Sequence, residues 1–449
     1  MSDLLNIGAS GVRAYQTALN TTSENIANAS TPGYARRSAT IQEVGRTTSV
    51  QLGQSINLTG NGSHVTGLVR SADAFKSAEV RSTGSDLART EAGVTWIERI
   101  EGALTGNQLS DRLTAFFTAA KGVAADPAAT APRSVMLEEA SALASAFTGT
   151  GRALASAGVE LAEQGQDAAK ALSDLAAGLS RVNRSLTRTA PNSSTQAELL
   201  DERDRILEGM SALIDVNVAV DDVGRATVRV GGNTGPVVAD TEGAAFFTFT
   251  MNTSGAVSIL ANRGNTSVAL SPQGGSMAGM VDAAGRIAGA RDNLHFLAGN
   301  FATQINDFQA DGRDLSGNPG GPIFAVGDTP TDLSLALTDP RGIAAAAVGE
   351  GPRGNGNMTA LSNLRTSADW EGQFDDAITD NAALLTARRN VASAQGSIHT
   401  TAIAARDMVT GVDLDEEAVN LIRFQQAYQA SSRVIQVARD ILQTIIDIR

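Results

Sequence analysis

Cysteine is absent from this chain of 449 residues. Its absence excludes a disulfide framework, a thiolate zinc site, an iron–sulfur cluster and a cysteine nucleophile. Lysine is nearly absent too, because arginine supplies all but three of the 35 basic residues. These face 48 acidic residues, which gives a formal net charge of −13. A general nucleic-acid binder needs a basic face and a polybasic membrane anchor needs a basic cluster, so we expect neither nucleic acid nor membrane as a partner.

Long apolar runs and histidines are also scarce. No stretch of about 18 apolar residues occurs, so we expect no transmembrane helix. The first residues, MSDLLNIGASGVRAYQ, lack the basic and apolar regions of a cleavable secretory signal, and we expect none. The three histidines, His64, His295 and His399, are far apart and form no HExxH motif, so each is expected to be a surface or packed residue.

The first helix is expected from about Asp3 to Ala29, because apolar residues recur there every seven positions. These heptad positions are Leu5, Val12, Leu19 and Ile26. A stripe this narrow favours a seam between two helices over the wide face of a core helix. Pro32 ends the helix, and Thr31–Tyr34 is typical of a type II turn with glycine at its third position.

The last helix is expected from about Leu414 to Ile448. One stripe follows a 3-4 spacing through Phe424, Ala427, Ser431, Val434, Ala438, Ile441, Ile445 and Ile448. A second stripe runs beside it through Leu421, Tyr428, Ile435, Leu442 and Ile446. Because both ends of the chain are heptad helices, we predict that they pair antiparallel, with the middle of the chain inserted between them.

The middle of the chain alternates between extended and helical patterns. Residues 35 to about 70 are predicted to be extended, and residues 72–213 to be helical, with breaks near residues 106, 126 and 191. The segment Leu154–Leu186 predicts a long bundle helix, with close approach at Gly158 and Gly165. Helix is expected again from about residue 276 to 310 and, after two glycine-rich loops, to the end of the chain.

Residues 215–272 alternate with period two around turn residues, which predicts β-hairpins. We therefore predict a mainly α fold with a small β insertion. Residues 1–60 with 405–449 would form a terminal helical domain that carries an extended segment. Residues 61–214 with 273–404 would form a helical-bundle domain, and 215–272 an inserted β domain.

Four motifs that resemble functional sites are interpreted as structural. Gly349–Gly354 matches GxGxxG, but Pro352 interrupts it, which indicates a loop rather than a dinucleotide site. Residues 311–318 lack the closing glutamate of a calcium loop and are typical of a turn. The acids at 413–417 are expected to cap a helix and complement its dipole, with Asp413 as N-cap, rather than to bind a metal. Asp201 and Arg205, four residues apart, are expected to be a surface helix pair.

All three tyrosines, Tyr15, Tyr34 and Tyr428, lie in the terminal elements. They are either amphipathic core residues or contacts between subunits, where aromatics with a polar tip are enriched.

Two segments at opposite ends of the chain resemble a known family. Asn25–Tyr34 resembles the N-terminal signature of bacterial flagellar rod, hook and hook-associated proteins, and Gly411–Ala430 resembles their C-terminal signature. Three further segments are similar to the hook-associated proteins of the hook–filament junction. They are 198–216, 306–324 and 354–357, and the pair Arg36-Arg37 also fits. The small middle β region departs from the larger members, which suggests fewer outer domains.

The resemblance implies a structural subunit and not an enzyme, with no catalytic residue, metal or cofactor. It implies export through the flagellar type III apparatus without a cleaved signal, and an extracellular place between hook and filament. The implied partners are further copies of the chain in a ring, the hook protein, the second hook-associated protein and an export chaperone at the C-terminal helix. The expected assembly contacts are Leu5, Val12, Leu19, Ile26, Tyr34, Phe424, Tyr428, Val434, Ile435, Ile441, Leu442 and Ile445.

Two alternatives remain open from the sequence. One is a hook protein or the second junction protein, because rod and hook proteins share much of both terminal signatures. The other is a secreted enzyme on an axial-protein scaffold, with its active site in the β insertion. That insertion contains no histidine and is small for an enzyme.

Overall fold

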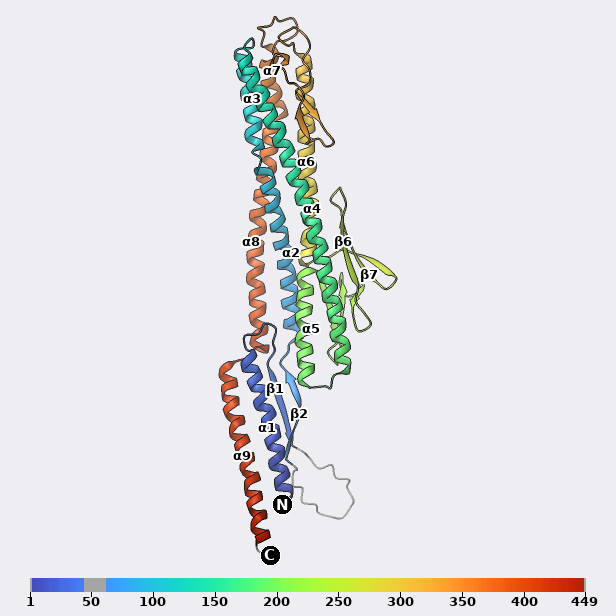
Figure 1. The fold of residues 1–449 in the computed structure, drawn as a ribbon, viewed down its shortest axis with the longest axis vertical. Coiled ribbons are helices and arrows are strands. Elements are labelled where there is room, and N and C mark those ends of the chain that lie inside the picture. Colours follow the sequence, from blue (N-terminus) through green and yellow to red (C-terminus); the bar gives the residue numbers. More distant parts are fainter. Residues whose placement is uncertain (1, 44–61, 448–449) are drawn as a thin grey trace.

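A computed structural model describes residues 2–43 and 62–447. The molecule is a long rod in which the two terminal helices form one end and a bundle of long helices forms the rest (Figure 1). Small antiparallel sheets lie on one side of the bundle. This confirms the predicted mainly α fold with a small β insertion. Within the described ranges, no helix is long and apolar enough to cross a bilayer. The predicted extended run at 55–58 and the seam position Ile448 lie outside these ranges.

The helices of the body, which we define as α2 to α8 with the sheets attached to them, begin and end close to where the sequence predicts. Side-chain caps explain two of the starts. Asp73 accepts hydrogen bonds from the backbone N–H groups of Phe75 and Lys76, and Ser193 accepts one from Gln196. The body helices are α2 (Ala74–Thr105), α3 (Leu109–Ala125), α4 (Thr130–Arg188), α5 (Ser194–Leu213), α6 (Gly275–Asp311), α7 (Gly356–Ala368) and α8 (Trp370–Thr410).

The helix α4 is 59 residues long and carries the predicted bundle stripe at residues 154–186. Leu154, Leu161, Leu172, Leu179 and Leu186 are all fully buried. Of the two predicted close approaches, only the one at Gly165 is tight, since a Cβ at Gly158 would lie at an ordinary 3.6 Å from Cε of Met251. A Cβ at Gly165 would overlap the ring of Phe249, which lies on a strand of the insertion rather than on another helix.

The insertion forms two three-stranded antiparallel sheets that pack against α4. Phe247, Phe249 and Ile259 are buried and belong to the same apolar core as the helices. The division into three domains therefore stays a prediction, because helices and sheets share one core. The strands are β3 (Val216–Val220), β4 (Ala226–Val230), β5 (Val237–Ala239), β6 (Phe246–Met251), β7 (Val257–Arg263) and β8 (Thr266–Leu270).

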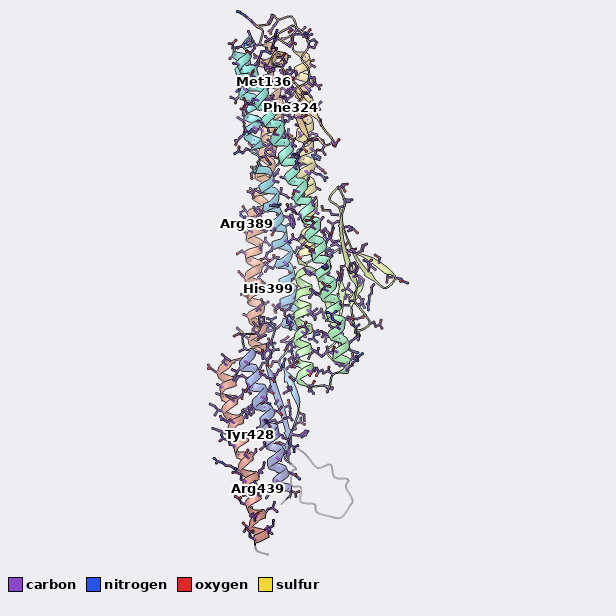
Figure 2. All side chains as sticks on the ribbon, in the orientation of Figure 1. Met136, Phe324, Arg389, His399, Tyr428 and Arg439 are labelled. Atoms are coloured by element: carbon purple, nitrogen blue, oxygen red, sulfur yellow. The ribbon has the colours of Figure 1, made fainter. Side chains whose placement is uncertain are left out.

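An aromatic cluster closes the end of the body that is far from the termini. Phe301 of α6 lies at its centre, 5.1 Å from the ring of Trp370, 5.7 Å from Phe116 and 5.4 Å from Phe324. Figure 2 labels Phe324 and Met136 in this region. Short elements complete this end of the rod: β9 (Phe324–Val326), β10 (Leu333–Leu335) and the 3-10 turn Pro340–Gly342. The predicted turn at 311–318 is confirmed, because the Asp314 carboxylate accepts from the N–H groups of residues 316 and 318.

The other end of the rod, which we call the tail, contains α1 (Ser2–Asn28), β1 (Arg37–Glu43), β2 (Ser63–Arg70) and α9 (Leu414–Asp447). The predicted antiparallel pairing of α1 with α9 is confirmed, and the β1–β2 ribbon packs on α1. The predicted turn is confirmed too. Tyr34 N–H donates to the Thr31 carbonyl at 3.1 Å, and Gly33 has a φ of 78°, which a type II turn requires at that position.

Candidate assembly surface and its joint to the body

Small residues on α1 set how closely the two terminal helices approach. A Cβ at Gly8 would lie 2.7 Å from Cγ1 of Ile435, and a Cβ at Gly11 would lie 2.6 Å from Oγ of Ser431. Further along the pair, the rings of Tyr15 and Phe424 are 6.5 Å apart. The contact is therefore closest at these two glycines, and a larger residue at Gly8 would require Ile435 or the helix backbone to shift.

The predicted stripe of α1 is only partly right. Leu5, Val12 and Leu19 are half-buried and Ile26 is 37% exposed. The residues that α1 buries are small or polar: Gly8, Gly11, Ala14, Ala18, Thr21, Thr22 and Asn25. The reason is geometric. The close contact follows the side with small residues, and the heptad residues Leu5, Val12 and Leu19 are left at its margin.

The predicted 3-4 seam of α9 divides into two sides in the structure. Ala438 is buried, while Phe424 and the second-stripe residues Tyr428, Ile435 and Leu442 are half-buried. Val434, Ile441 and Ile445 are instead 39%, 40% and 54% exposed. Most of the predicted second stripe therefore lies against α1, while part of the predicted 3-4 stripe faces outward. α9 keeps a second apolar side outward, which contains Val419, Val434, Val437, Ile441 and Ile445.

The acidic start of α9 caps the helix, as predicted, and one of its carboxylates also forms a buried ion pair. Asp413 accepts from the N–H groups of Asp415 at 2.9 Å and Glu416 at 3.2 Å. Glu417, however, is only 1% exposed, and its carboxylate accepts from Nε of Arg36 at 2.7 Å. The interpretation as a cap and dipole complement does not include this pair, because nothing in the sequence brings residues 36 and 417 together.

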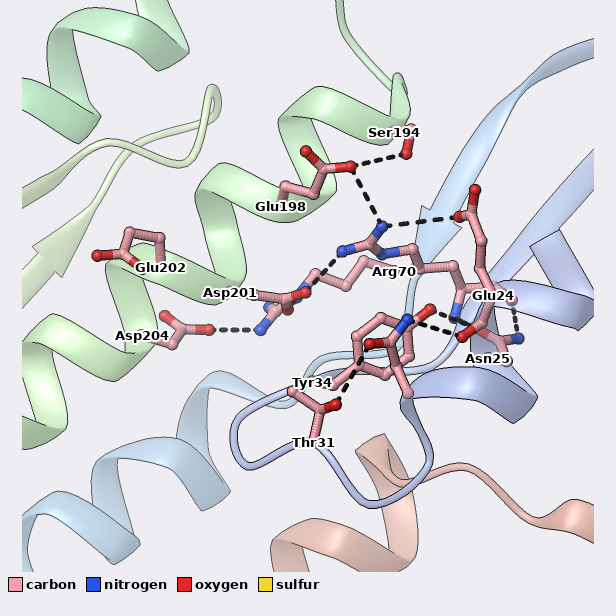
Figure 3. A network of polar contacts seen from close by, with 12 residues as sticks. Glu24, Asn25, Thr31, Tyr34, Arg70, Ser194, Glu198, Asp201, Glu202 and Asp204 are labelled. Carbon is pink, nitrogen blue, oxygen red and sulfur yellow. Dashed lines mark hydrogen bonds and ion pairs between the residues drawn. The ribbon is translucent and has the colours of Figure 1, made fainter. Parts of the chain in front are cut away.

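Tyr34 lies inside the tail, among groups of its own chain (Figure 3). Its hydroxyl donates to Oδ1 of Asn25 at 2.8 Å, and the Arg37 guanidinium lies 4.9 Å from its ring centre. Asn25 also bonds both backbone groups of Arg37, at 2.8 and 3.0 Å. Burial raises the pKa of Tyr34 to about 12. Of the two interpretations of the tyrosines, this geometry favours the internal one for Tyr34.

A network of buried charges joins the tail to α5 of the body (Figure 3). Arg37 donates to Asp201 at 2.8 Å, and Arg70 donates to Asp201 at 2.6 Å and to Asp204 at 2.8 Å. The predicted surface pair of Asp201 with Arg205 is wrong. Asp201 is 7% exposed and faces the tail, whereas Arg205 pairs with Glu202 at 2.6 Å. Helical spacing alone could not reveal that the Asp201 carboxylate binds two arginines, one from β1 and one from β2.

Other motifs remain structural where the chain is described. The GxGxxG match is a loop that closes on itself, because the Glu350 carboxylate accepts from the N–H groups of Ala347 and Gly356. His399 lies in the seam between α2 and α8, 3.0 Å from the hydroxyl of Thr83. Among residues 2–43 and 62–447, no group of three or more histidine or acidic side chains is arranged to hold a metal.

Three family models match the chain. The model described as "Flagellar hook-associated protein FlgK helical domain" matches residues 95–324, just over half of the chain. "Flagella basal body rod protein" matches residues 5–34, and "Flagellar basal body rod FlgEFG protein C-terminal" matches residues 409–448. Rod-type ends on both sides of a hook-associated body define the class, a structural protein of the bacterial flagellum. The chain belongs to the family of the flagellar hook-associated protein FlgK.

Full-length relatives agree with this assignment. Flagellar hook-associated protein 1 of Escherichia coli strain K12 is 24% identical over the whole of both chains. The protein of the same name from Bacillus subtilis strain 168 is 22% identical, over 97% of this chain and 96% of its own. The flagellar hook junction protein FlgK from Burkholderia pseudomallei matches in structure with a TM-score of 0.48 and 22% identity. It covers 55% of this chain and 46% of that one.

Proposed function

We propose that this flagellar protein forms the junction between hook and filament, as a ring of copies assembled through their terminal helices. The observation that supports this most is the outward apolar side of α9. Val434, Ile441 and Ile445 are between 39% and 54% exposed on a helix that already packs against α1. Apolar side chains left in water along one side of a helix are typical of an interaction surface. Neighbouring copies in a lattice would cover this side.

The proposed partners are further copies of the chain, the hook protein on one side and the second hook-associated protein on the other. The match to a helical domain of hook-associated proteins favours this position over the hook protein or the second junction protein. The proposed location is outside the cell, after export through the flagellar type III apparatus.

The proposed function includes no catalysis. An enzyme on this scaffold would carry its site in the β insertion. Two cavities of the described chain lie away from that insertion. A groove of about 530 Å³ lies between α6 and α8, and a polar cavity of about 830 Å³ lies between tail and body. Neither is lined by any residue of 215–272. A smaller pocket of about 280 Å³ does reach the insertion, at residues 215–218, and its lining contains no histidine.

A deletion strain tests the position in the flagellum. Electron microscopy should show cells with complete hooks and no attached filaments, and a plasmid copy of the gene should restore the filaments. Cells without hooks would indicate a hook or rod protein, and cells with normal filaments would contradict the proposal.

We also propose that an export chaperone binds α9 before secretion, through Phe424, Ile435, Leu442 and Ile445. An amphipathic helix laid in an apolar groove is a recurrent way to cover such a surface. The first three of these residues are half-buried in the tail, so α9 must leave α1 to bind. This agrees with export of an unfolded chain.

A pull-down tests the chaperone proposal. Deletion of residues 414–449 should abolish the complex, whereas Glu416→Gln with Glu417→Gln should preserve it, because the acidic turn is not part of the apolar surface. If the truncated chain still binds, the chaperone site lies elsewhere and the helix is an assembly surface only.

A further inference from the structure

Two adjacent arginines, Arg36 and Arg37, bind carboxylates on different parts of the molecule. Nε of Arg36 donates to Glu417 at 2.7 Å, and its Nη2 lies 3.1 Å from Glu416, both at the start of α9. Nη2 of Arg37 donates to Asp201 of α5 at 2.8 Å. Successive residues of extended backbone project to opposite sides, which is why neighbours in sequence reach separate helices.

These contacts bridge two helices that belong to different parts of the rod. α9 is the C-terminal helix of the tail, and α5 is a helix of the body. The backbone contacts nearby are few and polar. Arg36 N–H donates to the carbonyl of Thr410 at 2.8 Å, Ser71 N–H donates to the carbonyl of Arg36 at 2.8 Å, and Leu68 N–H donates to Asn192 at 2.6 Å.

The joint has open space beside this bridge. Arg37 and Asp201 line a pocket of about 290 Å³, and a larger cavity lies nearby. The cavity of about 830 Å³ is lined on the tail side by the turn at 29–35, and on the body side by Asp204, Glu208 and Arg406. The linker at 410–413 also borders it. Since side chains do not fill this space, apolar packing does not fix the angle between tail and body there.

Three of the bridging charges are buried, and this makes them specific to one arrangement. Glu417 is 1% exposed, Arg37 5% and Asp201 7%. A buried charge that loses its partner stays desolvated and unpaired, which is strongly unfavourable. The carboxylates of Glu417 and Asp201 keep these arginine partners only when α9, the arginine pair and α5 keep one relative orientation. Arg70 supports the α5 side, because it also donates to Asp201 and to Asp204. Buried ion pairs often specify an arrangement in this way rather than add net stability.

We propose that Arg36 and Arg37 form a two-sided clamp that fixes the angle of the terminal helix pair relative to the body. Removing the charge on either side frees that angle while tail and body each stay folded. The clamp is a property of the single chain, so it goes beyond the proposed function and does not rest on it. The positioning residues, which hold the tail at one angle to the body, are Arg36, Arg37, Asp201 and Glu417.

Distance measurements between spin labels test the clamp, because the chain has no cysteine that would take up label elsewhere. One pair joins tail to body through Arg439→Cys on α9 and Asn390→Cys on α8, both at exposed positions. A second pair, Asn390→Cys with Glu163→Cys on α4, stays within the body. In the otherwise unchanged chain, both distance distributions should be narrow.

On each side of the clamp, the carboxylate is then replaced by an uncharged amide of similar shape. Glu417→Gln and Asp201→Asn should each widen the tail-to-body distribution by about two-fold or more, because domain hinge motions become accessible. The matched control is Asp415→Asn, in the same helical turn but exposed, which should leave the width unchanged. Arg36→Lys keeps the charge and should widen it less than Arg36→Gln.

The second label pair separates loss of the clamp from loss of the fold. The proposal requires that the within-body distribution stay narrow in every variant. An unchanged tail-to-body width in both Glu417→Gln and Asp201→Asn would overturn it. Equal broadening of both label pairs would overturn it too, since the residues would then stabilise the fold rather than the angle.

Discussion

Single glycines decide where parts of this molecule come close. Gly165 of α4 faces the buried ring of Phe249, and Gly8 of α1 faces Ile435. The sequence predicts the approach at Gly165 from its place in the stripe of α4, but it cannot name the partner. The strand that carries Phe249 begins about 80 residues later, and its packing on α4 is a tertiary contact with no local pattern.

Gly165→Ala should destabilise the body, because its new methyl group must displace Phe249 from a packed core. We expect a loss of about 1–3 kcal/mol in the free energy of unfolding, measured with urea. The control is Gly93→Ala in α2, where a Cβ meets nothing within 4 Å. This variant should gain up to about 1 kcal/mol from helix propensity. Equal stability of the two variants would contradict the packing described for Gly165.

Tyr34 should ionise later than an ordinary tyrosine, because burial raises its pKa to about 12. In an ultraviolet titration of the three tyrosines, one should ionise near pH 12, and Tyr34→Phe should remove that step. The pKa is raised in the folded state. The stabilising effect is therefore fully present below pH 10, the ordinary pKa, and is lost as the pH rises through 12. A late step that survives in Tyr34→Phe would assign it to another tyrosine.

The bounds of the helices are largely predictable from the sequence. The side on which each helix packs is less predictable. The bounds of α1, α4 and α9 follow from apolar periodicity, Pro32 and the Asp413 cap, which are all local signals. The side on which α1 meets α9 does not follow from the heptads. Glycine and alanine contribute little to an apolar pattern in the sequence, yet they give the closest contact between the two helices. The ion pairs between tail and body could not be predicted from the sequence for another reason. Asp201 meets Arg37 and Arg70 only through the tertiary fold.

Ile441→Asp should block assembly and leave the monomer folded. Ile441 is 40% exposed in the single chain, so a carboxylate there meets water until a neighbouring copy covers it. Burial without a partner would then be unfavourable by several kcal/mol. Thermal unfolding should barely shift, while electron microscopy of cells with this variant should show no filaments.

The control for this variant is Gln436→Asp, at an exposed polar position of the same helix. It adds the same charge outside the apolar side and should keep the filaments. Normal motility with Ile441→Asp would show that the outward side of α9 is not an assembly contact.

At the scale of the whole molecule, the rod has one well-packed part and one lightly packed part. The body has a continuous core that extends from the aromatic cluster around Phe301 to the β sheets. Among the described residues of the tail, none belongs to this core. Among the described residues of α9, only Glu417 and Ala438 are buried. Stability should therefore differ along the rod, because local opening needs little free energy where few apolar contacts are lost.

Limited proteolysis of the monomer should remove both terminal helices and leave the body. The reason is the small buried area of α1 and α9 in a single chain, compared with the core of α2 to α8. Mass spectrometry of the fragments should place the first cuts within 1–30 and 414–449. Uniform resistance of both ends in a monodisperse monomer would contradict this expectation.

The pairing of the first helix with the last also sets an order of folding. α1 cannot find its partner until the final residues are available, and the chain between them is about 380 residues long. Closing so large a loop has an entropic cost, which grows with loop length. Once the body folds, the antiparallel pair of α2 and α8 brings residues 83 and 399 within hydrogen-bonding distance, and the effective loop becomes short. The slow, non-local step therefore belongs to the body. The tail closes last, when both ends of the chain already lie side by side.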